Sequence, residues 1–95
     1  MASTDVLQQR QAILQLAARH GMRNVRVFGS VARGNAGPDS DLDLLVDIED
    51  GRSLLDLIGL EQDLQELLGR RVEVVTERSL SPYFGQRVLA EAIAL

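Results

Sequence analysis

The chain has 95 residues, a formal net charge of −4 and a hydrophobic fraction of 45%, which favours a single globular domain over residues 1–95. The negative charge and an aromatic content of 3% argue against direct nucleic-acid binding, which needs a basic surface and stacking platforms. No apolar run is long enough to span a membrane. The absence of Cys excludes disulfides and thiolate metal sites, so we expect a cytoplasmic protein.

Hydrophobic periodicity and turn residues divide the chain into alternating helices and strands. In chain order they predict a helix over residues 4–20, strands over 24–28 and 41–48, a helix over 53–68, a strand over 71–76 and a last helix from Ser81-Pro82 to the C-terminus. The predicted fold class is therefore α/β (α+β), with a small mixed sheet of about three strands flanked by helices. The sheet edges leave homo- or hetero-oligomers possible.

Two of the predicted helices carry pronounced apolar stripes. The helix over 53–68 is expected to bury Leu54, Leu57, Ile58, Leu64 and Leu68. The last helix carries more apolar surface than one helix of a small domain must bury, namely Tyr83, Phe84, Val88, Leu89, Ala92, Ile93 and Leu95. This second stripe either closes the protein's own core or contacts a partner.

The strand over 41–48 combines an apolar face with an acidic one. Its even-numbered residues are all apolar and are expected to face the core, which places Asp41, Asp43 and Asp47 on the other face together with Leu45. Asp is a poor strand former, and neighbouring carboxylates repel unless a cation neutralises them. Oxygen-only ligands favour a hard ion such as Mg²⁺. The alternative is an ordinary exposed strand face.

A turn precedes this strand by ten residues. Gly29-Ser30 follows the strand over 24–28, and a glycine there lets the backbone approach a ligand closely. A helical turn after it would point N–H groups at an anion, with the Ser30 hydroxyl as a further donor. Arg33 follows, and it either holds a phosphate or forms a salt bridge with Asp39 or Asp41. Gly-Ser alone also fits a plain turn.

A third acidic position lies on the strand over 71–76. Glu73 stands between Val72 and Val74, which are expected to be buried, so Glu73 points to the opposite face. If this strand lies beside the Asp strand, Glu73 completes a cluster of three carboxylates, which suits a two-metal site for phosphoryl transfer. The alternative is a solvated Glu paired with Arg70 or Arg71.

The motif GSVARG…SDLDLLV, the helix LLDLIGLEQDLQELLG and the strand RVEVVT resemble the minimal nucleotidyltransferases of the DNA polymerase beta superfamily. The resemblance runs from about residue 24 to residue 76 and implies the nucleotidyltransferase fold. It implies that Gly29 and Ser30 contact the triphosphate of ATP. Asp41 and Asp43 would bind two Mg²⁺ ions, and Glu73 would take the third carboxylate position, where Asp is commoner.

The resemblance also implies a partner. Small members of this family are typically encoded beside a HEPN-domain toxin, and active ones transfer AMP from ATP to a hydroxyl of that toxin, often a tyrosine. The expected function is therefore an Mg²⁺-dependent protein adenylyltransferase that acts as an antitoxin. Because Glu73 departs from the common pattern, a second hypothesis remains, a non-catalytic module that neutralises its partner by steric contact. The sequence leaves the base specificity and the identity of the acceptor open.

Overall fold

The computed structural model describes residues 6, 8–34, 40–80 and 82–95, and the side chains of residues 82–84 lie outside this description. The elements are α2 (Arg10–Arg19), β1 (Met22–Phe28), α3 (Gly29–Arg33), β2 (Leu42–Ile48), α4 (Leu54–Leu68), β3 (Val72–Val75), the 3-10 helix η1 (Glu77–Ser79), α5 (Pro82–Glu91) and β4 (Ile93–Ala94). The fold is the expected mixed α/β arrangement. Residues 4, 5 and 7 of the first predicted helix, and Ser81, lie outside the described residues.

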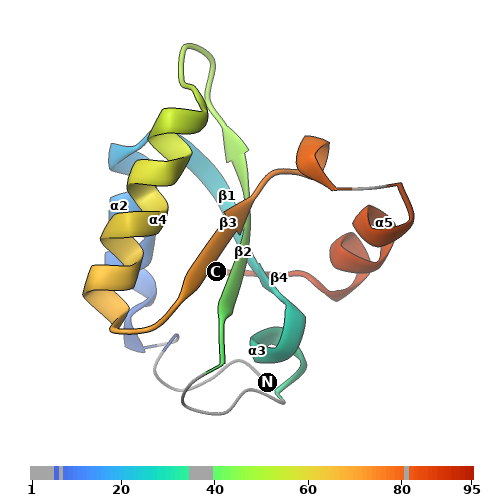
Figure 1. Cartoon of the computed structure of the whole chain (residues 1–95). Helices are drawn as coiled ribbons and strands as arrows, with labels where there is room; N and C mark the ends of the chain where they lie inside the picture. The colour runs from blue at the N-terminus through green and yellow to red at the C-terminus, as the bar shows by residue number, and fades with distance from the viewer. Residues whose placement is uncertain (1–5, 7, 35–39, 81) are drawn as a thin grey trace.

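A four-stranded mixed sheet organises the fold, in the order β3-β2-β1-β4. β2 and β3 are parallel, whereas β1 is antiparallel to both β2 and β4. Figure 1 shows α2 and α4 on one side of the sheet and α5 on the other, near α3. Among the described residues, no helix is long and apolar enough to cross a membrane.

The prediction for the C-terminus was wrong. The last helix ends at Glu91, and the chain then forms β4, which pairs with Arg26 and Val27 of β1. The Leu95 amide donates to the carbonyl of Val25 at 3.0 Å. The final apolar residues therefore satisfy the free hydrogen-bonding edge of β1, and the sheet has four strands instead of about three.

The core occupies both faces of the sheet. On the α2–α4 side, three even-numbered residues of β2 are buried as expected, whereas Ile48 is only partly buried. The three belong to one cluster with residues of β1, β3 and the helices: Val6, Ile13, Ala17, Met22, Val25, Val27, Val31, Ala32, Leu42, Leu44, Val46, Leu57, Leu60, Leu64, Val72 and Val74. On the opposite face, Leu45 packs with Phe28 and with Val88 of α5. The last helix thus closes part of the core, while Leu89 and Ile93 remain exposed.

Helix α4 buries only part of the predicted stripe, and it buries Leu60 in addition. Leu57, Leu60 and Leu64 are buried, whereas Leu54 is 67% exposed and Ile58 is 47% exposed. The buried residues follow the i, i+3, i+7 spacing of a single helix face. Leu54 lies at the helix start, where it borders a hollow at the end of the sheet instead of the core.

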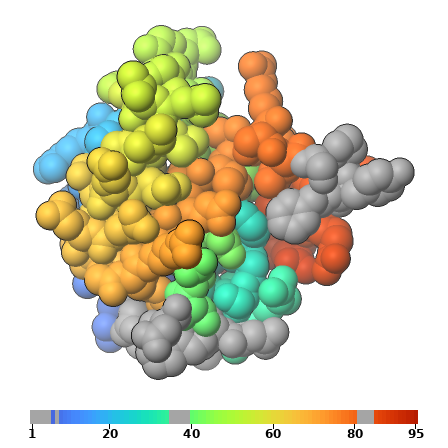
Figure 2. Space-filling view, viewed as in Figure 1, coloured from blue at the N-terminus to red at the C-terminus, as the bar shows by residue number. Residues whose placement is uncertain are grey.

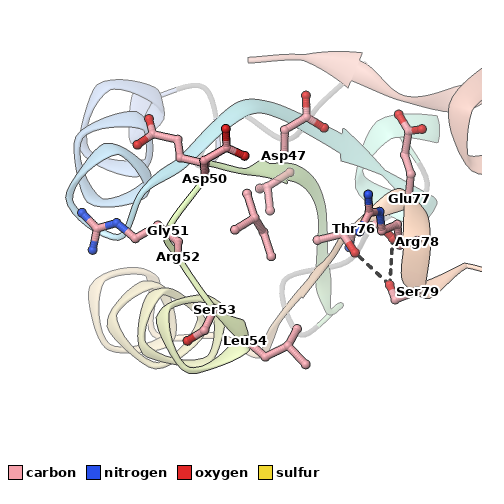
Figure 3. A pocket seen from close by; sticks show the side chains of 13 residues that line it. Asp47, Asp50, Gly51, Arg52, Ser53, Leu54, Thr76, Glu77, Arg78 and Ser79 are labelled. Atoms are coloured by element: carbon pink, nitrogen blue, oxygen red, sulfur yellow. Dashed lines mark hydrogen bonds between the residues drawn. The ribbon is translucent and has the colours of Figure 1, made fainter.

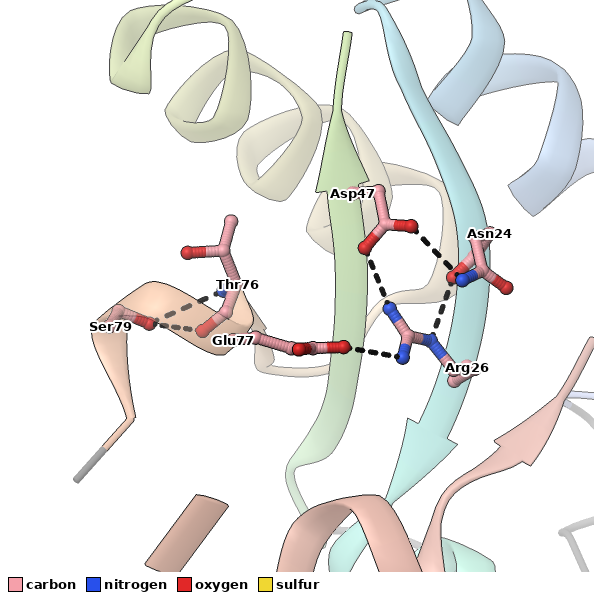
Figure 4. A network of polar contacts seen from close by, with 6 residues as sticks. All are labelled: Asn24, Arg26, Asp47, Thr76, Glu77 and Ser79. Atoms are coloured by element: carbon pink, nitrogen blue, oxygen red, sulfur yellow. Dashed lines mark hydrogen bonds and ion pairs between the residues drawn. The ribbon is translucent and has the colours of Figure 1, made fainter. Parts of the chain in front are cut away.

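Strand β1 begins two residues earlier than predicted because a bulge interrupts its alternation. The pairing with β2 shifts between Arg23 and Arg26, and Asn24 adopts a φ of 53°, a conformation that Asn tolerates better than most residues. As a result Met22 and Val25 both face the core. Figure 4 shows that Arg26 lies between Asp47 of β2 and Glu77 of η1, and donates to the Asn24 carbonyl.

Helix α4 begins with a capping box. The Ser53 side chain accepts from the Leu55 amide at 3.2 Å, and Asp56 accepts from the Ser53 amide at 2.9 Å. This backbone hydrogen bond from Ser53 is the main reason why the pKa of Asp56 lies below its usual value of 3.8. A lowered pKa means that the stabilisation is fully present above the usual carboxyl pKa and is lost as the pH falls through the lowered value.

We therefore expect Asp56→Ala to lower the melting temperature at neutral pH, and the difference from wild type to shrink as the pH falls below about 4. Thermal unfolding followed by circular dichroism measures this. Asp50→Ala is the matched control, because Asp50 is exposed in the preceding loop and is not part of the capping box. A difference at Asp56 that stays constant with pH would contradict the capping role.

Candidate active site

The acidic residues predicted from the sequence lie at one end of the two parallel strands. Asp43 of β2 and Glu73 of β3 are register partners, so their side chains leave the same face of the sheet. Val72 and Val74, which flank Glu73, are buried as expected. Asp41 directly precedes β2 and is exposed. The two strands therefore bring Glu73 beside the acidic strand, which is the condition that the sequence analysis had left open.

The Gly-Ser turn faces this pair from the neighbouring strand. Phe28, the last residue of β1, is the register partner of Asp43, and α3 begins at the next residue, Gly29. Gly29 has a φ of 74°, and a Cβ added there would overlap Oδ2 of Asp43. Only glycine allows the backbone both this conformation and this approach to the carboxylate. The short helix α3 thus follows the turn, where the predicted elements had included no helix and a plain turn had remained the alternative.

All six predicted site residues line one cavity of about 620 Å³. Figure 2 shows the surface where the start of β2 (green), α3 (teal) and α5 (red) adjoin. The complete lining is Phe28, Gly29, Ser30, Arg33, Ser40, Asp41, Asp43, Glu73, Arg87, Val88 and Glu91. Its size is within the range of small-molecule sites.

The cavity holds more negative than positive charge near Asp43. The pKa of Asp43 is raised from 3.8 to about 6, first because the carboxyl is half-buried and then because Glu73 and Asp41 repel its charge; Arg33 acts in the opposite direction. A divalent cation would relieve this repulsion, and the donor set consists of carboxylate oxygens, which suit Mg²⁺. In the part of the chain that the structure describes, however, no three acidic or His side chains converge as a ready metal-binding group.

Arg33 has a different partner from those considered in the sequence analysis. Its guanidinium pairs with Glu91 of α5 at 3.0 Å, not with Asp41, and Asp39 lies outside the described residues. The alternative pairing of Glu73 with Arg70 or Arg71 is not seen among the described residues. Arg70 instead donates to the carbonyl of Ser40 at 3.0 Å, which anchors the residue before Asp41.

Sequence reasoning missed the contribution of α5 to this cavity. Arg87, Val88 and Glu91 line it, and Val88 is only 2% exposed because it packs on Phe28 and Leu45. The sequence pattern that could have revealed this contribution is the spacing of Arg87 and Glu91. They are four residues apart and therefore lie on one face of a helix. No motif of the resembling family drew attention to it.

Helix α4 fixes the outer edge of β3, and with it the position of Glu73. Glu61 accepts from the Val74 amide at 2.9 Å, and Gln65 accepts from the Val72 amide at 3.3 Å. These two amides flank Glu73 on the strand edge that β2 does not occupy. The edge is therefore satisfied by side chains of the same chain, which lowers its tendency to pair with another strand.

A second, larger hollow lies elsewhere and shares none of the predicted site residues. It measures about 920 Å³ and is bordered by the end of β2, the loop into α4 and residues 76–79. Figure 3 shows Asp47, Asp50 and Glu77 around it together with Arg52 and Arg78. Two of these carboxylates, Asp47 and Glu77, are already paired with Arg26. The smaller cavity is therefore the better candidate for an active site.

Comparison with known proteins gives matches over most of the chain. A family model for a nucleotidyltransferase domain matches residues 9–95. The protein adenylyltransferase MntA of Thermococcus cleftensis is 47% identical over 79 residues, which are 83% of this chain and 80% of that protein.

Solved structures show the same fold. A proposed minimal nucleotidyltransferase is 55% identical and superposes with a TM-score of 0.88, covering 100% of this chain and 97% of that one. A toxin–antitoxin crystal structure with AMP-PNP is 26% identical, with a TM-score of 0.75, and the match covers 88% of this chain and 69% of that one.

Proposed function

This chain belongs to the family of nucleotidyltransferase domains, and from that premise we propose that it is an Mg²⁺-dependent protein adenylyltransferase that modifies a HEPN-domain toxin and so acts as its antitoxin. AMP transfer in general is supported by the relative named protein adenylyltransferase and by the complex with AMP-PNP. The acceptor would be a hydroxyl of the partner, most simply a tyrosine. ATP would be the AMP donor.

The observation that carries the proposal is the single cavity in which Asp43 and Glu73, paired across two parallel strands, face the Gly29-Ser30 turn. The carboxylates of Asp41, Asp43 and Glu73 are the groups that would hold two Mg²⁺ ions. When bound, Mg²⁺ supplies positive charge that offsets the triphosphate and the carboxylates. Gly29, Ser30 and Arg33 would bind the phosphates.

The transfer itself requires a hydroxyl, a phosphorus atom and a leaving group. The acceptor oxygen forms a bond to the α-phosphorus, the bond from that phosphorus to the bridging oxygen breaks, and pyrophosphate leaves. Glu73 is the candidate to take the hydroxyl proton, because it is exposed to an incoming partner and lies beside Asp43. The role of this chain is therefore mainly to position the nucleotide and to accept that proton.

The second candidate function is a binding module that neutralises its partner without catalysis. It is favoured by Glu73 in place of the commoner Asp, and by the lack of a ready three-ligand metal group among the described residues. In this case nucleotide binding would be vestigial or regulatory.

The variants Glu73→Asp and Glu73→Gln distinguish the two functions. For an enzyme adapted to Glu, we expect Glu73→Gln to lose at least roughly a hundredfold in transfer rate, within the range attributed to general-base catalysis. Glu73→Asp should then change the rate by less than about tenfold, on the order of 1.4 kcal/mol in the barrier. Single-turnover transfer of labelled AMP to the partner measures both. A much larger gain with Asp would instead identify the native chain as a decayed enzyme.

A further inference from the structure

Helix α5 forms the wall of the cavity that faces α3. Val88 is buried against Phe28 and Leu45, which anchors the middle of the helix on the sheet. Arg87 and Glu91 flank this anchor and both line the cavity. Because they are separated by one helical turn, they lie on the same side of α5.

The charges of the cavity are divided between two walls. The strands supply Asp41, Asp43 and Glu73, whereas the two arginines, Arg33 and Arg87, come from α3 and α5. Arg33 is held by Glu91 at 3.0 Å. Among the residues that the structure describes, no carboxylate is paired with Arg87, and its side chain is exposed.

We propose that Arg87 is a second phosphate-binding arginine of this site and that it binds the phosphates that leave as pyrophosphate; this rests on the proposed function. The reacting α-phosphate of ATP has to lie near the carboxylates. The β- and γ-phosphates then lie toward the wall formed by α3 and α5, which carries the arginines of the cavity. A guanidinium can donate two parallel hydrogen bonds to a phosphate. Because the Arg87 guanidinium has no carboxylate partner among the described residues, it breaks no ion pair when it binds a phosphate. Glu91 is a positioning residue that holds Arg33 at the same wall.

Equilibrium binding of ATP and of AMP, each with Mg²⁺, tests this assignment by isothermal titration calorimetry on the full chain. We expect Arg87→Ala to weaken ATP binding at least tenfold and AMP binding less than about twofold. Arg87→Gln, which keeps most of the side-chain length, should behave in the same way and serves if the alanine variant folds poorly. Arg19→Ala, a matched exposed arginine near the end of α2, should change neither affinity.

Two results would overturn the assignment while the proposed function stands. One is ATP affinity that Arg87→Ala and Arg87→Gln leave unchanged, which would show that Arg87 does not contact the phosphates. The other is an equal loss for ATP and AMP accompanied by a lowered melting temperature, which would show that Arg87 only stabilises α5. A wild-type chain that binds no ATP would instead overturn the proposed function, and this assignment with it.

Discussion

Asp43→Asn is expected to abolish AMP transfer while leaving a folded protein. Asp43 is the half-buried member of the acidic cluster, is the register partner of Glu73 across the two parallel strands and is one of the carboxylates that would hold Mg²⁺. Loss of its charge should reduce the transfer rate roughly a thousandfold or more, on the order of 4 kcal/mol in the barrier. A single-turnover assay with labelled ATP and the purified partner measures this loss.

The stability of the same variant provides an independent check. Because Asp43 is crowded by burial and by two other carboxylates, the neutral amide should be tolerated at least as well as the charged carboxylate in metal-free buffer. We expect a melting temperature equal to or above that of wild type. Active sites typically lose stability in exchange for activity, so removing a catalytic charge can restore some of it. If the variant is inactive and also unfolded, the loss of AMP transfer would be explained by unfolding. That result would contradict this account of Asp43.

Asp47→Asn is the matched control on the same strand. Asp47 lies on the same face of β2, four residues beyond Asp43, but its carboxylate pairs with Arg26 at 2.9 Å and lies outside the candidate cavity. This variant should retain transfer within about twofold and lose at most about 1 kcal/mol of stability, as expected for a partly exposed ion pair. Equal losses of activity at both positions would show that the acidic face, and not the cavity, matters.

Gly29→Ala should produce the second largest effect. The backbone at Gly29 has a φ of 74°, and the added Cβ would overlap Oδ2 of Asp43. The left-handed conformation alone costs an alanine about 1–2 kcal/mol. The overlap displaces either the turn or the carboxylate, so transfer should fall at least roughly a hundredfold, which is the sensitivity expected for a misplacement of about 1 Å.

Gly51→Ala separates backbone strain from the overlap. Gly51 has a similar φ of 85°, but no atom lies within 4 Å of the position of an added Cβ. It should therefore lose a similar amount of stability without losing transfer, as measured by thermal unfolding and by the same rate assay. Full activity in Gly29→Ala would contradict the close approach of the turn to Asp43.

The sequence was sufficient for the parts of the site that depend on local alternation. Period-two patterning accounts for the apolar and acidic faces of the strand over 41–48 and for the exposure of Glu73 between two buried valines. Turn chemistry accounts for the glycine at position 29. The pairing of β2 with β3 joins two consecutive strands that are connected by one helix, α4. It therefore depends on no distant part of the chain.

Features that depend on distant segments could not be predicted in this way. The pairing of β4 with β1 and the packing of Val88 on Leu45 join residues far apart in the chain, so the last helix was extended too far and Arg87 and Glu91 were overlooked. The bulge at Asn24 changes which residues of β1 face the core, and simple alternation cannot show this. Leu54 has the right helical spacing for burial, but it is exposed and borders the larger hollow instead of the core.

The most direct measurement compares ATP labelled at the α-phosphate with ATP labelled at the γ-phosphate, each incubated with this protein, Mg²⁺ and the partner toxin. The account predicts that the α-label alone becomes covalently attached to the partner, and that Asp43→Asn abolishes the labelled band. Transfer of the γ-label would identify a kinase-type reaction and contradict the proposal. An unlabelled partner that this protein nevertheless neutralises would show that it acts by contact and not by AMP transfer.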